Sequence, residues 1–209
     1  MIDLYTWTTP NGRKVSIMLE ELGIPYTVHA INIGQGEQHT PAFLKIAPNN
    51  KIPAIYDHDN DLALMESGAI LLYLAEKTWR FLPAEEHKRW STIEWLMWQM
   101  GGIGPFLGQV HHFVKYNKGK SPYSEERFLK EAYRLYTVLD QRLEGREFIV
   151  DQLTIADFAV WPWIARHDWQ GIDLNEYPNV KRWYLTMVAR PAVVKGFHLP
   201  KKVQEIPMP

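Results

Sequence analysis

The pair Glu66-Ser67 is the first candidate for chemistry, because it places a carboxylate and a hydroxyl where a helix is predicted to begin. Residues 49–73, which contain this pair, also have Pro53 just before a short apolar segment and a polar turn before a second one. Taken alone, Glu66-Ser67 is better explained as an ordinary helix cap. The surrounding sequence therefore has to decide between a binding site and a cap.

The cysteine content restricts the chemistry further. The 209 residues include no cysteine, which excludes disulfides, Cys-ligated zinc, a Cys-x-x-Cys redox motif and a cysteine nucleophile. Any thiol chemistry must therefore use a thiol that the protein binds.

Three other polar or glycine-rich groupings carry weaker signals. His111 and His112 point in different directions on a helix and have no third ligand at metal spacing, so we expect no metal site and place them in an interdomain cleft or on the surface. The run 166–168, Arg-His-Asp, has no nucleophile beside it, which favours a solvated helix end. The glycine cluster 101–105 lacks the Lys and Ser/Thr of a phosphate loop and predicts a helix kink.

Composition sets the class of partner. The chain is 46% hydrophobic and 22% charged with a net charge of -1, which is typical of a globular protein without general affinity for nucleic acid or anionic lipid. The longest apolar run, 69–75, is too short to span a bilayer, and the first residues do not resemble a signal peptide. We therefore expect a soluble cytoplasmic protein with no nucleic-acid or membrane partner.

The first 79 residues predict a small α/β domain. Thr9 and Pro10 form a helix start between two apolar segments, which indicates a parallel βαβ unit, and a hairpin and a helix capped by Ser67 follow. The expected strands are 2–7, 26–33, 54–56 and 62–65, and the expected helices are 10–22 and 68–77.

The remaining residues predict a helical domain. Residues 80–87 are polar and contain proline, so we place the linker there and an all-helical domain at 88–209. Thr154 and Asp157 have the spacing of a capping box, with Leu153 and Phe158 placed as its hydrophobic staple. The fold class is thus α/β (βαβ-ββα, residues 1–79) plus all-α.

These features together resemble the cytosolic glutathione transferases. The segments 9–12, 48–54 and 66–74 are similar to those of the nu-class, disulfide-bond oxidoreductase branch, and the likeness covers nearly the whole chain. The resemblance implies a thioredoxin-like N-terminal domain, a cis bond at Pro53, and a homodimer that binds glutathione near the subunit interface.

The resemblance also implies how glutathione is held. Ser67, at a helix N-terminus, suits the γ-glutamyl carboxylate, and Glu66 would meet the α-amino group. The main chain of Ile52 would pair with the cysteinyl part in an antiparallel fashion. Further implied contacts come from Gln38, Pro53 and Arg127, and Lys51 is a candidate for the glycyl carboxylate.

Thr9 and Asn11 stand where this family binds the sulfur. A hydrogen-bond donor and the positive end of a helix both favour thiolate over thiol, so these two residues are the predicted catalytic residues. Tyr5 is an alternative sulfur donor, although an aromatic residue in the core of a strand is the favoured interpretation.

Three functions follow as hypotheses. The leading one is a glutathione-dependent disulfide-bond reductase that acts by thiol exchange through bound glutathione. The second is conjugation of glutathione to hydrophobic electrophiles, because the same thiolate would serve both reactions. The third is a non-catalytic protein that keeps the glutathione-binding fold for partner recognition.

Overall fold

The computed structural model describes all 209 residues, which form two compact units. Unit 1 contains residues Met1–Leu82 and Ala189–Glu205, and unit 2 contains Pro83–Val188 and Ile206–Pro209. No helix is both long and apolar enough to cross a membrane.

Unit 1 is built on a four-stranded mixed sheet with the order β2-β1-β3-β4. β1 pairs in parallel with β2 and antiparallel with β3, and β3 pairs antiparallel with β4, so the predicted βαβ-ββα arrangement is confirmed. The strands are β1 (Ile2–Thr6), β2 (Tyr26–Ala30), β3 (Ala54–Asp57) and β4 (Leu62–Met65).

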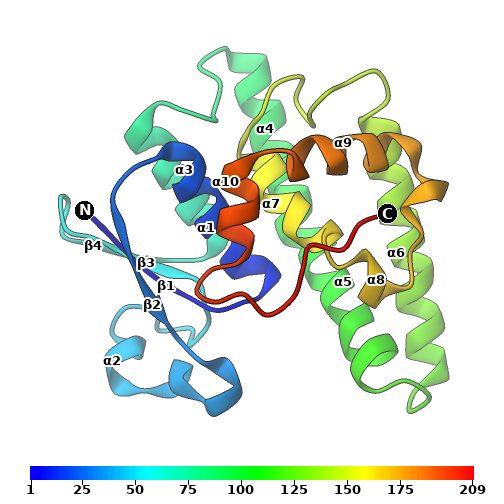
Figure 1. Cartoon of the computed structure of the whole chain (residues 1–209), viewed down its shortest axis with the longest axis horizontal. Coiled ribbons are helices and arrows are strands. Elements are labelled where there is room, and N and C mark those ends of the chain that lie inside the picture. The colour runs from blue at the N-terminus through cyan, green and yellow to red at the C-terminus, as the bar shows by residue number, and fades with distance from the viewer. The chain divides into compact units, whose positions relative to one another are not determined.

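Helices cover both faces of this sheet. α1 (Pro10–Leu22), α3 (Ser67–Thr78) and α10 (Pro191–Phe197) lie on one side in Figure 1, and α2 (Pro41–Leu44) lies on the other with two 3-10 turns, Ile33–Gln35 and Glu37–His39. Both predicted helices of the first domain are therefore present.

The position of α10 corrects the expected domain limits. The boundary at Leu82 falls inside the expected linker 80–87, but residues 189–205 belong to unit 1 and not to a helical domain 88–209. The reason is close packing on α1: the Ser16 hydroxyl donates to the Gly196 carbonyl at 2.7 Å, and a Cβ on Gly196 would lie 2.6 Å from the Ile17 Cα.

Unit 2 is helical throughout. Every residue of α7 (Ile155–Ile164) is buried, so this helix forms the centre of the unit. Residues 99–103 form a π-helical turn between two helices, which agrees with the predicted kink. The other helices are α4 (Glu86–Trp98), α5 (Gly104–Val110), α6 (Pro122–Arg142), α8 (His167–Gln170) and α9 (Pro178–Val188), with a second π-helical turn at His111–Tyr116 and a 3-10 turn at Leu174–Glu176.

The predicted capping box at the head of α7 is confirmed. The Thr154 hydroxyl oxygen accepts from the Ala156 N–H at 3.3 Å, and the Asp157 carboxylate accepts from the Thr154 N–H at 2.9 Å. The same carboxylate accepts from the Ile149 N–H at 3.0 Å and from the Trp183 indole N–H at 2.9 Å. It therefore also links α7 to the preceding loop and to α9.

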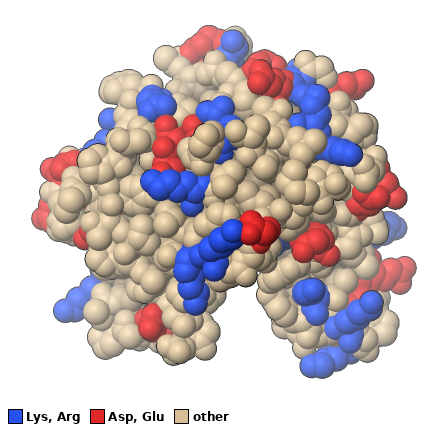
Figure 2. Space-filling model, in the orientation of Figure 1, with Lys and Arg blue, Asp and Glu red and all other residues tan.

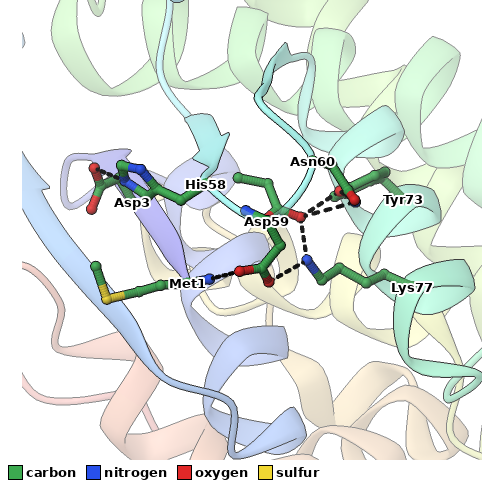
Figure 3. Close-up of polar contacts among 8 residues, drawn as sticks. Met1, Asp3, His58, Asp59, Asn60, Tyr73 and Lys77 are labelled. Carbon is green, nitrogen blue, oxygen red and sulfur yellow. Dashed lines mark hydrogen bonds and ion pairs between the residues drawn. The ribbon is translucent and has the colours of Figure 1, made fainter.

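A polar network fixes α3 to the β3–β4 hairpin (Figure 3). Asp57 is fully buried and accepts hydrogen bonds from Tyr73 and Lys77 of α3. Lys77 also pairs with Asp59 at 2.8 Å, and Asp59 accepts from the Met1 ammonium at 2.6 Å. The helix that begins at Ser67 is thereby anchored near its other end.

Asp57→Asn should lower the free energy of unfolding by about 2 kcal/mol at neutral pH, because it removes a buried partner of Lys77. Burial would raise the pKa of Asp57, but hydrogen bonds from Lys77 and Tyr73 outweigh it and hold that pKa below its usual 3.8. A carboxyl whose pKa is lowered by folding stabilises the fold at pH values above its pKa in the unfolded state. This stabilisation is lost as the pH falls through the pKa in the folded state. Urea unfolding should therefore show that the difference in free energy of unfolding between the native protein and Asp57→Asn becomes smaller towards about pH 3. A difference that does not change with pH would contradict this role.

The surface charge agrees with the near-neutral sequence. On the face drawn in Figure 2, lysine and arginine side chains are interspersed with aspartate and glutamate and form no continuous patch of one sign. This face offers no extended basic surface of the kind that binds nucleic acid.

Candidate active site

The first turn of α1 presents hydrogen-bond donors at the end of β1. Thr9 is the N-cap, and its hydroxyl oxygen accepts from the Gly12 N–H at 3.2 Å. The hydroxyl proton remains available for donation to a bound group. Asn11 is half-buried in the same turn, where the first backbone N–H groups have no partner within the helix and the helix dipole is positive. This turn can therefore stabilise an anion such as a thiolate.

Gly12 allows this turn to approach β1 closely. A Cβ at this position would lie 2.3 Å from the Trp7 carbonyl oxygen and 2.4 Å from the Thr6 hydroxyl oxygen. Any side chain would therefore displace the start of α1, and Thr9 and Asn11 with it.

Gly12→Ala should lower the free energy of unfolding by about 1–3 kcal/mol, because the added methyl group meets the backbone carbonyl oxygen of Trp7 as well as the Thr6 hydroxyl. Chemical denaturation measures this change, and Gly101→Ala is the control, since its added Cβ would meet no heavy atom within 4 Å beyond its own stretch of chain. Equal stability of the two variants would contradict the close approach at Gly12.

The second half of the site is the N-terminus of α3. Ser67 is 3% exposed and is the first residue of the helix. Glu66 precedes it with φ +70°, a conformation that costs a non-glycine residue about 1–3 kcal/mol and that is found preferentially at functional sites. The Glu66 carboxylate accepts from the Asn49 side chain at 3.5 Å. A carboxylate and a hydroxyl thus stand side by side at the positive end of a helix.

Lys14 connects the two halves of the site and was not among the predicted site residues. Its side chain is 1% exposed, and its ammonium donates to the Ser67 hydroxyl oxygen at 3.2 Å. Burial lowers the pKa of Lys14 to about 7, while the nearby Glu66 carboxylate acts in the opposite direction. A signal was available, because Lys14 lies one turn before Met18, in a row of apolar residues on the inner face of the helix.

The segment before β3 supplies main-chain groups. The Ile52–Pro53 peptide bond is cis, as the resemblance implies. The Ile52 side chain packs on the core cluster around Phe43 and Ala54, and its main chain lies just ahead of the first paired residue of β3. Lys51 beside it is exposed.

Gln38 stands in the 3-10 turn of residues 37–39. Its buried Oε1 atom has no hydrogen-bond partner within the chain, and its amide nitrogen lies 3.3 Å from the His39 Nε2. A buried acceptor without a partner is costly, and a ligand N–H would satisfy it.

Arg127 belongs to unit 2. It lies exposed on α6 and lines a surface cavity of about 580 Å³. The seven other predicted site residues lie in unit 1, so the contribution of Arg127 to the same site stays a prediction.

The surroundings of Tyr5 favour the core interpretation. Its ring stacks on His29 with the centroids 4.7 Å apart and packs against the core cluster that contains Phe43. Burial and the charge of Asp3 raise the pKa of Tyr5 above its usual 10, so its hydroxyl stays protonated.

Two expectations for polar residues of unit 2 were wrong for part of each group, because only His112 and Asp168 are exposed. His111 is buried, with its ring near Trp163 and its Nε2 3.1 Å from the Gln170 side chain, so it lines no cleft; His112 is exposed. Arg166 and His167 are also buried and do not form a solvated helix end. No cluster of three potential metal ligands is present.

Two protein-family models match the chain. The one described as glutathione S-transferase, N-terminal domain, matches residues 8–77, and the one described as glutathione S-transferase, C-terminal domain, matches residues 104–191. The chain belongs to the glutathione S-transferase family. Seven predicted site residues and Lys14 lie within the first match, and Arg127 lies within the second.

Individual relatives of this glutathione S-transferase agree with the branch that its motifs indicated. It is 49% identical over 198 residues to the disulfide-bond oxidoreductase YfcG of Escherichia coli, with 92% of each chain covered. A glutathione transferase family member from Pseudomonas fluorescens, crystallised with two glutathione bound, has 48% identity and a TM-score of 0.89 over 95% of this chain and 93% of its own. A glutathione transferase from Pseudomonas putida, with one glutathione disulfide bound per subunit, has 40% identity and a TM-score of 0.89 over 95% of this chain and 91% of its own.

Proposed function

We propose that this transferase is a glutathione-dependent disulfide-bond reductase that acts by thiol exchange through bound glutathione. The observation that carries the proposal is the helix N-terminal turn from Thr9 to Gly12, which can stabilise an anion, in a chain that has no cysteine of its own. The thiol that reacts must therefore come from glutathione. The name of the relative YfcG, a disulfide-bond oxidoreductase, supports this assignment.

Glutathione is held along the edge of unit 1. The γ-glutamyl carboxylate binds at Ser67 and the α-amino group at Glu66, because each group meets its complementary charge or dipole. The cysteinyl residue pairs with the main chain of Ile52 beside Pro53, and Gln38 contributes a further polar contact. Arg127 is a further proposed contact, as the family resemblance implies.

The thiol group then lies at the first turn of α1. Thr9 and Asn11 donate hydrogen bonds to the sulfur, and the helix dipole adds a favourable field, so the bound thiol loses its proton more readily than in water. The protein contributes orientation and electrostatic stabilisation and forms no covalent bond to the substrate.

The reaction is two consecutive exchanges. The bound thiolate attacks one sulfur of the substrate disulfide, the S–S bond breaks, and a mixed disulfide forms as the first substrate thiol leaves and takes a proton. A second glutathione thiolate attacks the glutathione sulfur of the mixed disulfide, which releases the second substrate thiol and oxidised glutathione. Relatives crystallised with two glutathione or with glutathione disulfide support a site that holds both glutathione units of the oxidised product.

Conjugation to electrophiles is the competing activity, because it needs the same thiolate. Parallel assays with a small disulfide and with a chlorinated aromatic electrophile separate the two. We expect glutathione-driven disulfide reduction to have the higher kcat/KM; turnover of the electrophile alone would overturn the proposal. Tight glutathione binding without turnover of either substrate would indicate a non-catalytic binding protein.

Ser67→Ala should weaken glutathione binding by about tenfold, because it removes a buried hydrogen bond to a charged group. Isothermal titration calorimetry measures this change. Thr186→Ala, which removes a surface hydroxyl in unit 2, is the control and should leave the affinity unchanged. Equal glutathione affinities of the two variants would contradict the proposed contact between the γ-glutamyl carboxylate and Ser67.

The proposal includes a cytoplasmic homodimer, as the family resemblance implies. Light scattering on the purified protein should give twice the mass of the 24.5 kDa chain. The monomer mass would contradict the dimer.

A further inference from the structure

We propose that Lys14 is a positioning residue of the carboxylate end of the site, which holds the Ser67 hydroxyl and binds a proton when glutathione enters. This inference rests on the proposed function, since it assigns a role within the same glutathione site.

The Lys14 ammonium is next to Ser67, the residue proposed to bind the γ-glutamyl carboxylate. Lys14 projects from the second turn of α1 and donates to the Ser67 hydroxyl oxygen at 3.2 Å. Because that oxygen accepts from the ammonium, the Ser67 proton is directed away from Lys14 and towards a ligand. A carboxylate held by Ser67 is therefore also close to a positive charge.

Burial makes this cation responsive to its surroundings. Lys14 is 1% exposed and lies among core residues of α1 such as Val15 and Met18, which are fully buried. Desolvation favours the neutral amine and lowers the pKa of Lys14 to about 7, so a mixture of neutral and charged forms is present near neutral pH. A bound carboxylate favours the charged form, and the affinity must then fall as the pH rises through the free-state pKa.

The Glu66 carboxylate is the acidic group that acts on Lys14, and it favours the ammonium. Arg13, which precedes Lys14 in the sequence, points towards α10, where its guanidinium carbon lies 3.6 Å from the centre of the Phe197 ring. The charged groups on the elements around α1 are engaged with each other: Lys195 with Glu20, Arg190 with Glu21, Lys77 with Asp57, and His58 with Asp3. Burial and the Glu66 carboxylate therefore act in opposite directions on the protonation of Lys14, and the carboxylate of an incoming ligand would add to the effect of Glu66.

The test is the number of protons taken up on binding. S-methylglutathione is the probe, because its sulfur does not titrate and its carboxylates are ionised. Calorimetric titrations in phosphate and in Tris at neutral pH should give different apparent enthalpies for the native protein, corresponding to uptake of a substantial fraction of a proton. The dissociation constant should rise several-fold from about pH 6 to about pH 9.

Lys14→Met should abolish the dependence on buffer and weaken binding about tenfold while the fold is kept, since an apolar chain of similar length replaces a buried charge. Lys14→Arg is the second variant: it keeps the charge and cannot release a proton, so it should bind without proton uptake. A thermal melt confirms folding of both. A native protein with no proton uptake, or undiminished uptake in Lys14→Met, would overturn the inference.

The two proposals fail in different ways. If the proposed function is wrong, the probe does not bind or disulfide reduction is absent. If only the role of Lys14 is wrong, the probe binds and disulfides are reduced, but the apparent enthalpy of binding does not depend on the buffer.

Discussion

Asn11→Ala should lower kcat/KM for glutathione-driven disulfide reduction by at least about tenfold, because removing one preorganised donor to a reacting anion commonly costs more than that. Asn11 lies in the first turn of α1, where its amide adds to the field of the helix N-terminus. The loss should appear in kcat more than in glutathione affinity, since the sulfur contact is only one of several to the peptide.

The control for this variant is Asn175→Ala, in the 3-10 turn of unit 2. It removes the same side chain far along the sequence from the proposed site and should keep native activity. A coupled assay that follows the formation of oxidised glutathione measures both variants. Unchanged turnover of Asn11→Ala would refute its catalytic role.

Asp157→Ala should lower the free energy of unfolding by about 3 kcal/mol, the largest stability effect that we expect from one substitution. Asp157 is fully buried and accepts from the Thr154 and Ile149 N–H groups and from the Trp183 indole. The variant would leave these donors buried without their acceptor. It would also remove half of the capping box of the central helix α7.

Denaturant unfolding followed by tryptophan fluorescence measures the effect, because unit 2 contains most of the tryptophans. Asp168→Ala is the matched control, since Asp168 is exposed at a short helix of the same unit. Equal midpoints for the two variants would show that the buried carboxylate contributes no net stability.

Local signals in the sequence were sufficient for the α/β topology. Thr9 and Pro10 mark the start of α1, and the capping box of Thr154 and Asp157 lies within four residues of chain. The placement of α10 could not be predicted this way. It depends on contacts such as Ser16 to Gly196, which are 180 residues apart in the sequence.

The site was predicted in part for the same reason. Glu66-Ser67 is a contiguous pair at a helix start, whereas the contact of Lys14 with Ser67 joins residues 53 positions apart. A lysine in a helix is usually exposed, so the residue type alone predicts a surface position for Lys14. The buried Arg166 and His167 were misjudged because charged residues were again expected at the surface.

The central claim is that this transferase works by holding glutathione as a thiolate, and the pKa of the bound thiol tests it most directly. Ultraviolet absorbance of the thiolate, measured against pH with the site saturated, gives that value. The account predicts a pKa well below the usual thiol value of about 8.5 in the native protein and a return towards that value in Asn11→Ala. A bound thiol that titrates like the free one in the native protein would contradict the account.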